Sequence, residues 1–254
     1  MRAAFGFALA TLAGALSTVP HAYTQSWFLG VISAAVLAAL WQRQTALRAA
    51  ALAWGFGLGW LLSGTWWLFV SMHRYGQMPA LLAGAAVLAL SAALSLYLAL
   101  FLGWAARWRS AGLLAHLCGF AGAWLLAELA RGVWFTGFPW VAAGYAQVDG
   151  PLRSLAPWVG VYGIGAAVAA LGAALAWPWH PGAGPRRWWV PAVALGVCAA
   201  APLLQIQATR SSGELTVSLV QPQVAQDEKF DPLRLPRILD DLQHALEAAQ
   251  GELV

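Results

Sequence analysis

The chain has 254 residues, of which 61% are hydrophobic and only 9% are charged. A soluble globular domain carries roughly 25% charged residues, so these few charges cannot cover a surface that faces water on all sides. The net charge of +4 comes from dispersed arginines and a single lysine, Lys229. Because no basic cluster is present, the composition does not indicate a nucleic-acid partner and predicts an integral membrane protein.

Seven apolar segments are predicted to cross a membrane, because a spanning helix needs about 20 mainly apolar residues. The first follows Met1 and Arg2 directly, and we interpret it as a transmembrane helix rather than a cleaved signal peptide. The second is the shortest. In chain order the segments are 3–20, 26–41, 50–70, 78–104, 111–130, 155–177 and 188–205.

The arginines between these segments predict an orientation, because cytoplasmic loops of membrane proteins are enriched in Lys and Arg. A cytoplasmic N-terminus places Arg2, Arg43, Arg48, Arg107, Arg109, Arg186 and Arg187 inside and only Arg74, Arg131 and Arg153 outside. Seven crossings then put the C-terminal tail outside. In a bacterium this predicts a multi-pass protein of the inner membrane with a periplasmic tail.

The tail differs in composition, since eight of the ten acidic residues follow position 213. We therefore predict a membrane domain over 1–206 and a solvated region over 207–254. Residues 214–221 are rich in β-branched side chains and predict a strand. Asp231 is a candidate N-cap for a following helix with Pro232 at its first position, and residues 252–254 predict a second strand. This order is typical of the start of an α/β domain, but about 40 residues are too few to bury a core alone.

A loop over residues 128–157 is unusually aromatic for a connector. Phe138, Trp140 and Tyr145 are candidates for contacts with lipid acyl chains and headgroups, because aromatic side chains favour the membrane interface. Glu128 and Arg131 lie three residues apart at the end of a helix and are expected to pair. The alternative interpretation is an aromatic belt with a purely structural ion pair.

The same loop carries motifs of a known family: E-x-x-R-G at 128–132, F-T-G-F-P-W at 135–140, G-Y-x-Q at 144–147 and D-G-P-L at 149–152. Further matches in the same order are W-G-F-G at 54–57, G-Q-M-P at 76–79, L-S-L-Y at 94–97, V-S-L-V-Q-P at 217–222 and Q-D-E-K-F-D at 226–231. From about residue 50 onward the chain resembles the apolipoprotein N-acyltransferase family.

The resemblance implies a membrane domain followed by a nitrilase-like (CN hydrolase) domain. It also implies an acyltransferase that moves an acyl chain from a phospholipid to the N-terminal amine of a diacylglyceryl-cysteine, through a Glu-Lys-Cys triad and a thioester acyl-enzyme. None of the three triad residues matches a position in this sequence, so no catalytic residue is assigned and the 254-residue chain is expected to be inactive. Phe230 stands where family members commonly carry Trp, and is a candidate acyl contact.

The implied partners are a phospholipid donor and a diacylated lipoprotein acceptor, and the protein is expected to be a monomer without a cofactor. The five histidines show no short metal-ligand spacing, so no metal is predicted. The alternative function is a non-catalytic membrane scaffold or lipid-binding protein derived from the family. A transporter is disfavoured, because transport pathways place ionisable residues in mid-membrane and these segments contain almost none.

Overall fold

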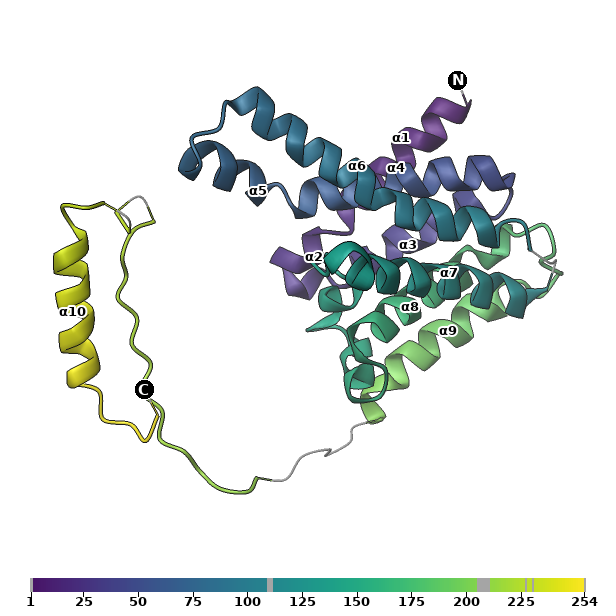
Figure 1. Cartoon of the computed structure of the whole chain (residues 1–254). Helices are drawn as coiled ribbons and strands as arrows, with labels where there is room; N and C mark the ends of the chain where they lie inside the picture. Colours follow the sequence, from purple (N-terminus) through teal and green to yellow (C-terminus); the bar gives the residue numbers. More distant parts are fainter. Residues whose placement is uncertain (1, 109–111, 205–210, 227, 230, 254) are drawn as a thin grey trace. The chain divides into compact units, whose positions relative to one another are not determined.

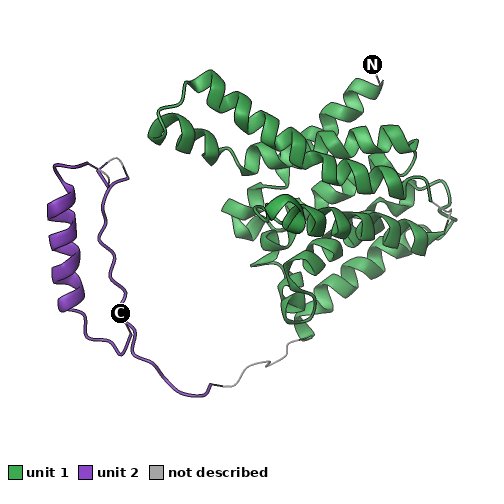
Figure 2. Cartoon of the chain, viewed as in Figure 1, with its two compact units in different colours: residues 1–206 green, residues 207–254 purple. Residues whose placement is uncertain are grey.

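The computed structural model describes residues 2–108, 112–204, 211–226, 228–229 and 231–253. The chain divides into two compact units, residues 1–206 and residues 207–254 (Figure 2). Phe230, a candidate from the sequence, lies outside the described residues.

The first unit is a bundle of α-helices joined by short helical turns (Figure 1). Its α-helices are α1 (Arg2–Leu16), α2 (Val19–Ala22), α3 (Phe28–Trp41), α4 (Ala46–Gly64), α5 (Trp67–Val70), α6 (Ala80–Ala105), α7 (Leu113–Val133), α8 (Ala156–Ala176) and α9 (Trp189–Ala200). The turns are η1 (Thr24–Ser26), η2 (Ser71–Tyr75), η3 (Trp134–Thr136), η4 (Ala143–Gln147), η5 (Pro151–Leu155), η6 (Trp177–Trp179) and η7 (Ala201–Leu203), of which η2 is a π-helix.

Six segments of the described chain are long and apolar enough to cross a membrane: Ala3–Ala22, Thr24–Trp41, Ala46–Gly64, Ala80–Ala105, Leu113–Thr136 and Pro151–Trp179. The prediction of seven spans therefore needs correction at 188–205. There α9 has 12 residues, which is a length of about 18 Å at 1.5 Å per residue, against a hydrocarbon core of about 30 Å. The span predicted over 50–70 is also displaced, because α4 begins at Ala46 and ends at Gly64.

Helix α9 nevertheless packs against α8 and has contacts near both ends of that longer helix. Val190, near its start, packs with Trp177 at the end of α8. Beyond its last residue, the Ala201 carbonyl accepts a hydrogen bond from Ser154 Oγ, just before α8 begins (2.7 Å). We call the end of the bundle that carries residues 134–155 the loop end. Within the part of the chain that the structure describes, six segments reach spanning length and α9 packs against them as a shorter apolar helix.

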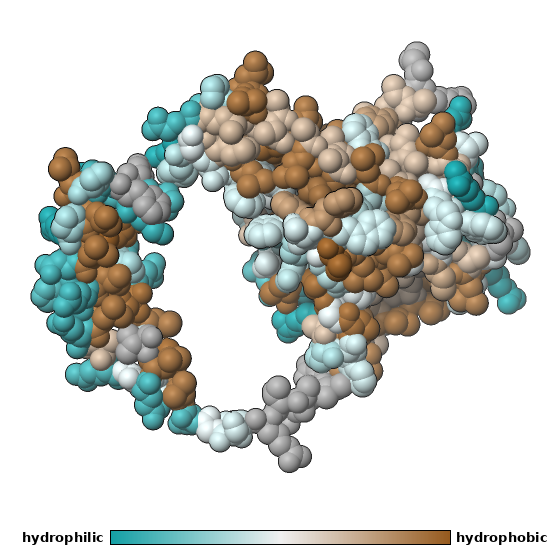
Figure 3. All heavy atoms as spheres, in the orientation of Figure 1, coloured by the Kyte–Doolittle hydropathy of each residue, from teal (hydrophilic) through white to brown (hydrophobic). Residues whose placement is uncertain are grey.

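Glycines set the closest helix contact, between α1 and α4. A Cβ on Gly14 would collide with the Phe56 carbonyl, and one on Gly59 would collide with the Thr11 carbonyl. Small residues allow such backbone approach where lipid removes the hydrophobic drive between helices. Behind this contact lie the largest buried side chains, among them Trp41, Phe56 and Phe120. The outer surface is also rich in apolar side chains, as expected for a face that meets lipid (Figure 3).

The second unit contains α10 (Leu235–Glu247), which confirms the helix predicted in the tail. The predicted strand 214–221 is not formed: the described residues hold a single parallel bridge, Val217 to Leu253, because no further strand pairs with it. The helix begins later than predicted, and Asp231 Oδ1 instead accepts the backbone N–H of Leu233 in the preceding turn (3.0 Å).

Candidate lipid-binding site at the loop end

A buried ion pair lies near the end of α7. Glu128 Oε1 and Arg131 Nη2 are 3.5 Å apart, and the two side chains are 1% and 4% exposed. The pair was predicted from its i, i+3 spacing, but its burial was not. A charge pair removed from solvent is stable only when further hydrogen bonds satisfy its remaining donors and acceptors. The neighbouring loop supplies hydrogen bonds to Glu128 Oε1 and Arg131 Nη1, whereas Glu128 Oε2 and Arg131 Nη2 are buried without a hydrogen-bond partner among the described residues.

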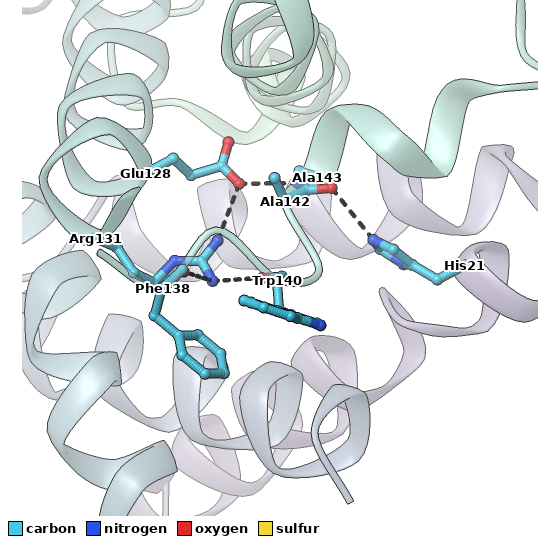
Figure 4. Close-up of polar contacts among 7 residues, drawn as sticks. All are labelled: His21, Glu128, Arg131, Phe138, Trp140, Ala142 and Ala143. Atoms are coloured by element: carbon cyan, nitrogen blue, oxygen red, sulfur yellow. Dashed lines mark hydrogen bonds and ion pairs between the residues drawn. The ribbon is translucent and has the colours of Figure 1, made fainter. Parts of the chain in front are cut away.

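The loop that follows α7 folds back over the pair (Figure 4). Arg131 Nη1 donates to the carbonyls of Trp140 (2.7 Å) and Phe138 (3.3 Å). Glu128 Oε1 accepts the backbone N–H of Ala143 (2.8 Å), and the Phe138 N–H donates to the Arg131 carbonyl (2.7 Å). The E-x-x-R pair thus fixes the path of residues 138–143, which explains why Glu128 and Arg131 accompany the F-T-G-F-P-W motif.

Helices α2 and α4 also contact this loop and its ion pair. His21 Nε2, at the end of α2, donates to the Ala142 carbonyl (3.2 Å; Figure 4). The Arg131 guanidinium carbon lies 5.2 Å from the centre of the Trp60 ring, on α4. This is cation–π distance, and burial strengthens such a contact. The loop is therefore connected to three helices.

The loop backbone adopts conformations that few residues tolerate. Phe135, Thr136 and Val141 have positive φ angles of 53°, 73° and 52°. Gly137 has φ +80°, and a Cβ there would also collide with the Gly132 carbonyl. Strained backbone of this kind persists only where the surroundings over-determine it, and it is concentrated at functional sites. The Glu128–Arg131 network provides that constraint.

The strained turn forms one wall of an apolar groove of about 750 Å³. Helix α6 forms the other wall, and the groove is open along the bundle surface, since Leu96 and Leu100 are each 58% exposed. Tyr97 of α6 lies against Trp134, with ring centres 5.9 Å apart. The lining is Ala50, Leu90, Ala93, Leu94, Leu96, Tyr97, Ala99, Leu100, Arg131, Trp134, Phe135, Thr136, Gly137 and Phe138.

The structure separates the aromatic residues proposed from the sequence. Phe138 is half-buried and lines the groove. Trp140 is 52% exposed and packs between Phe138 and Trp67, with ring centres 5.5 and 6.4 Å away, outside the groove lining. Tyr145 is 54% exposed in η4 and also lies outside that lining. The α6 wall was missed as a site, although the L-S-L-Y motif at 94–97 marked it.

Comparisons with known proteins give matches over most of the chain. Residues 13–174 match the family model described as the apolipoprotein N-acyltransferase N-terminal domain. The chain is similar to proteins named apolipoprotein N-acyltransferase from Ralstonia nicotianae (44% identity, 90% of this chain and 44% of the relative) and Verminephrobacter eiseniae (45%, 90% and 46%). A protein of that name from Bordetella bronchiseptica is 40% identical over 90% of this chain and 45% of its own length.

The chain spans less than half the length of these three relatives. Its matched residues include the buried pair, the strained loop and α6. These relatives, with the six apolar helices, identify a bacterial membrane protein. The chain belongs to the apolipoprotein N-acyltransferase family.

Proposed function

We propose that the chain forms the membrane part of an apolipoprotein N-acyltransferase and holds an acyl chain of the donor phospholipid in the groove between α6 and residues 134–138. The observation that carries this proposal is the open apolar groove whose wall is fixed by the Glu128–Arg131 pair. Along α6 the groove extends from Leu90 to Leu100, which is about 15 Å of helix. One leaflet of a hydrocarbon core of about 30 Å has the same depth.

The acceptor in this proposal is the amine of a diacylglyceryl-cysteine at the start of a lipoprotein, which fits the name of the family. We assign no catalytic nucleophile to residues 1–254. The sequence has two cysteines, Cys118 and Cys198, and they lie on apolar helices α7 and α9. A thiol needs an adjacent base or cation for activation. Among the described residues, no ion pair or hydrogen bond connects Cys118 or Cys198 to such a group.

We further propose that residues 207–254 belong to a nitrilase-like domain in the periplasm, with the N-terminus in the cytoplasm and the bundle in the inner membrane. The parallel bridge and α10 support the first part, since parallel pairing around a helix is the βαβ unit of α/β domains. The arginines support the orientation, because cytoplasmic loops are enriched in Lys and Arg. Three arginines lie at the loop end (Arg74, Arg131 and Arg153), and five lie in or beside the loops of the opposite end (Arg43, Arg48, Arg107, Arg186 and Arg187).

The test is transfer of a phospholipid acyl group to a diacylated lipopeptide in proteoliposomes. Two proteins are compared: the 254-residue chain, and the same chain joined to the part of the Ralstonia relative that lies beyond the match. We expect transfer only from the joined protein. Transfer by the 254-residue chain would contradict the assignment of no nucleophile, and a joined protein that folds but is inactive would favour a non-catalytic lipid-binding role.

The groove itself is tested in the joined protein with two matched substitutions on α6. Ala93→Trp places an indole in the groove, because Ala93 is exposed and lines it. Ala85→Trp adds the same side chain to an exposed position of the same helix that does not line the groove. We expect Ala93→Trp to raise the KM for the phospholipid and Ala85→Trp to leave it unchanged. Equal effects of the two substitutions would refute the groove as the acyl site.

A further inference from the structure

A second pocket at the loop end is polar and has a volume of about 510 Å³. Asp149, Arg153 and Ser154 line it, together with Gly150, Pro151, Ala156, Pro157 and Pro202. None of these residues lines the α6 groove. The pocket therefore brings one acidic and one basic side chain together where α8 begins and α9 has ended.

The two charged groups are available for a ligand. Asp149 and Arg153 are both exposed. Asp149 Oδ2 accepts a hydrogen bond from the Thr24 hydroxyl. This bond fixes the position of the carboxylate and leaves its other oxygen, Oδ1, for a ligand. Within the described parts of the chain, neither the Asp149 carboxylate nor the Arg153 guanidinium takes part in an ion pair.

The backbone that carries these side chains is firmly held. Ser154 Oγ donates to the carbonyls of Ala201 (2.7 Å) and Pro151 (3.1 Å), which ties the start of α8 to the end of α9. Gly150 N–H donates to the Gln147 carbonyl (2.9 Å), and Leu152 is buried. A preorganised pocket of this kind loses little freedom when a ligand binds.

A separate apolar groove of about 420 Å³ lies next to the pocket, between α7, α8 and α9. It starts at Leu152, Leu155 and Ala201, which are next in sequence to the pocket residues Pro151, Ser154 and Pro202. It then extends along Cys198, Val197 and Val193 to Trp189 and Leu113 near the opposite end. A polar pocket beside a long apolar groove matches the two parts of a phospholipid, a headgroup and an acyl chain.

The position of the pocket relative to the membrane agrees with this assignment. The apolar span that contains α8 begins at Pro151, so Asp149 and Arg153 lie where hydrocarbon gives way to headgroups. A guanidinium forms paired hydrogen bonds with phosphate oxygens, and a carboxylate complements an ammonium group. We propose that this pocket and groove bind a phospholipid whose headgroup carries both a phosphate and a primary amine, with Arg153 on the phosphate and Asp149 on the amine.

The test measures lipid retention by the purified, delipidated chain with native mass spectrometry. The probes are phosphatidylethanolamine, phosphatidylglycerol, and glycerophosphoethanolamine as a headgroup without acyl chains. Arg153→Gln removes the phosphate partner and should weaken retention of both lipids about tenfold, since a charge-assisted hydrogen bond contributes enough for that change. Asp149→Asn should weaken retention of phosphatidylethanolamine alone, and it keeps an acceptor for Thr24. Arg153→Lys should retain part of the affinity.

Two further variants separate this site from general effects. Arg48→Gln removes an exposed arginine near the start of α4, away from this pocket, and should change nothing. Val193→Trp fills the groove at a position that is 51% exposed and should lower retention of both lipids. Wild-type retention by Arg153→Gln and Asp149→Asn would overturn the proposal, and so would binding of glycerophosphoethanolamine as tight as that of the lipid. Loss of acyl transfer with lipid retention intact would refute the proposed function and leave this site standing.

Discussion

The Glu128–Arg131 pair offers the sharpest test of how the loop end is built. Replacing Arg131 with Met removes the cation but keeps an apolar side chain of similar length. It leaves Glu128, which is 1% exposed, as a buried charge without its partner, and it removes the donor for the Trp140 and Phe138 carbonyls. Breaking a buried pair on one side destabilises a protein by about 3–5 kcal/mol.

For a bundle of this size a change of 1 kcal/mol shifts the unfolding temperature by roughly 2–4 °C, so Arg131→Met should lower it by roughly 6–20 °C. The assay is thermal unfolding of the detergent-solubilised chain, followed by the fluorescence of its 16 tryptophans. Arg48→Met is the control, because Arg48 is exposed near the start of α4, and it should stay within about 0.5 kcal/mol of wild type.

The double variant Glu128→Gln, Arg131→Met separates the charge from the hydrogen bonds. Gln can still accept the Ala143 N–H, but it leaves no unpaired charge. We therefore expect the double variant to be more stable than Arg131→Met by about 1–3 kcal/mol, as is typical of coupled neighbours. Strictly additive losses, or an unfolding temperature for Arg131→Met equal to that of wild type, would refute the buried network as the determinant of the loop.

Three further outcomes follow from the backbone and the tail. Gly137→Ala should destabilise the loop by about 1–3 kcal/mol, measured by the same unfolding assay, because φ is +80° and the Gly132 carbonyl blocks a Cβ. Gly59→Ala should lower stability by about 1–3 kcal/mol by separating α1 from α4, whereas Gly196→Ala, which meets open space, should not. In proteoliposomes trypsin should cut first in the tail at Arg237, because the side chain of Arg237 is 88% exposed. Equal protection of the tail and the bundle would show that the tail has a partner.

The membrane class and the positions of most helices could be predicted from the amino-acid sequence alone. Apolar segments of spanning length can be read directly, because lipid requires each helix to satisfy its own backbone hydrogen bonds. The prediction of a spanning helix was wrong at α9, which has 12 residues. Only the tertiary contacts show that this short helix packs near Trp177 at its start and that the chain just beyond it is bonded to Ser154. The strand predicted at 214–221 also needs neighbouring strands to pair with, and a single parallel bridge between Val217 and Leu253 is the pairing that the described residues provide.

At the loop end the Glu128–Arg131 pairing and the aromatic composition could be predicted from the sequence, since both depend on residues close in the chain. Only the tertiary structure decided that Arg131 donates to the Phe138 and Trp140 carbonyls and that α6 forms the second wall of the groove. The pocket of Asp149 and Arg153 likewise requires Pro202, from beyond α9. Contacts between distant segments depend on how whole helices pack, and local spacing carries no information about them.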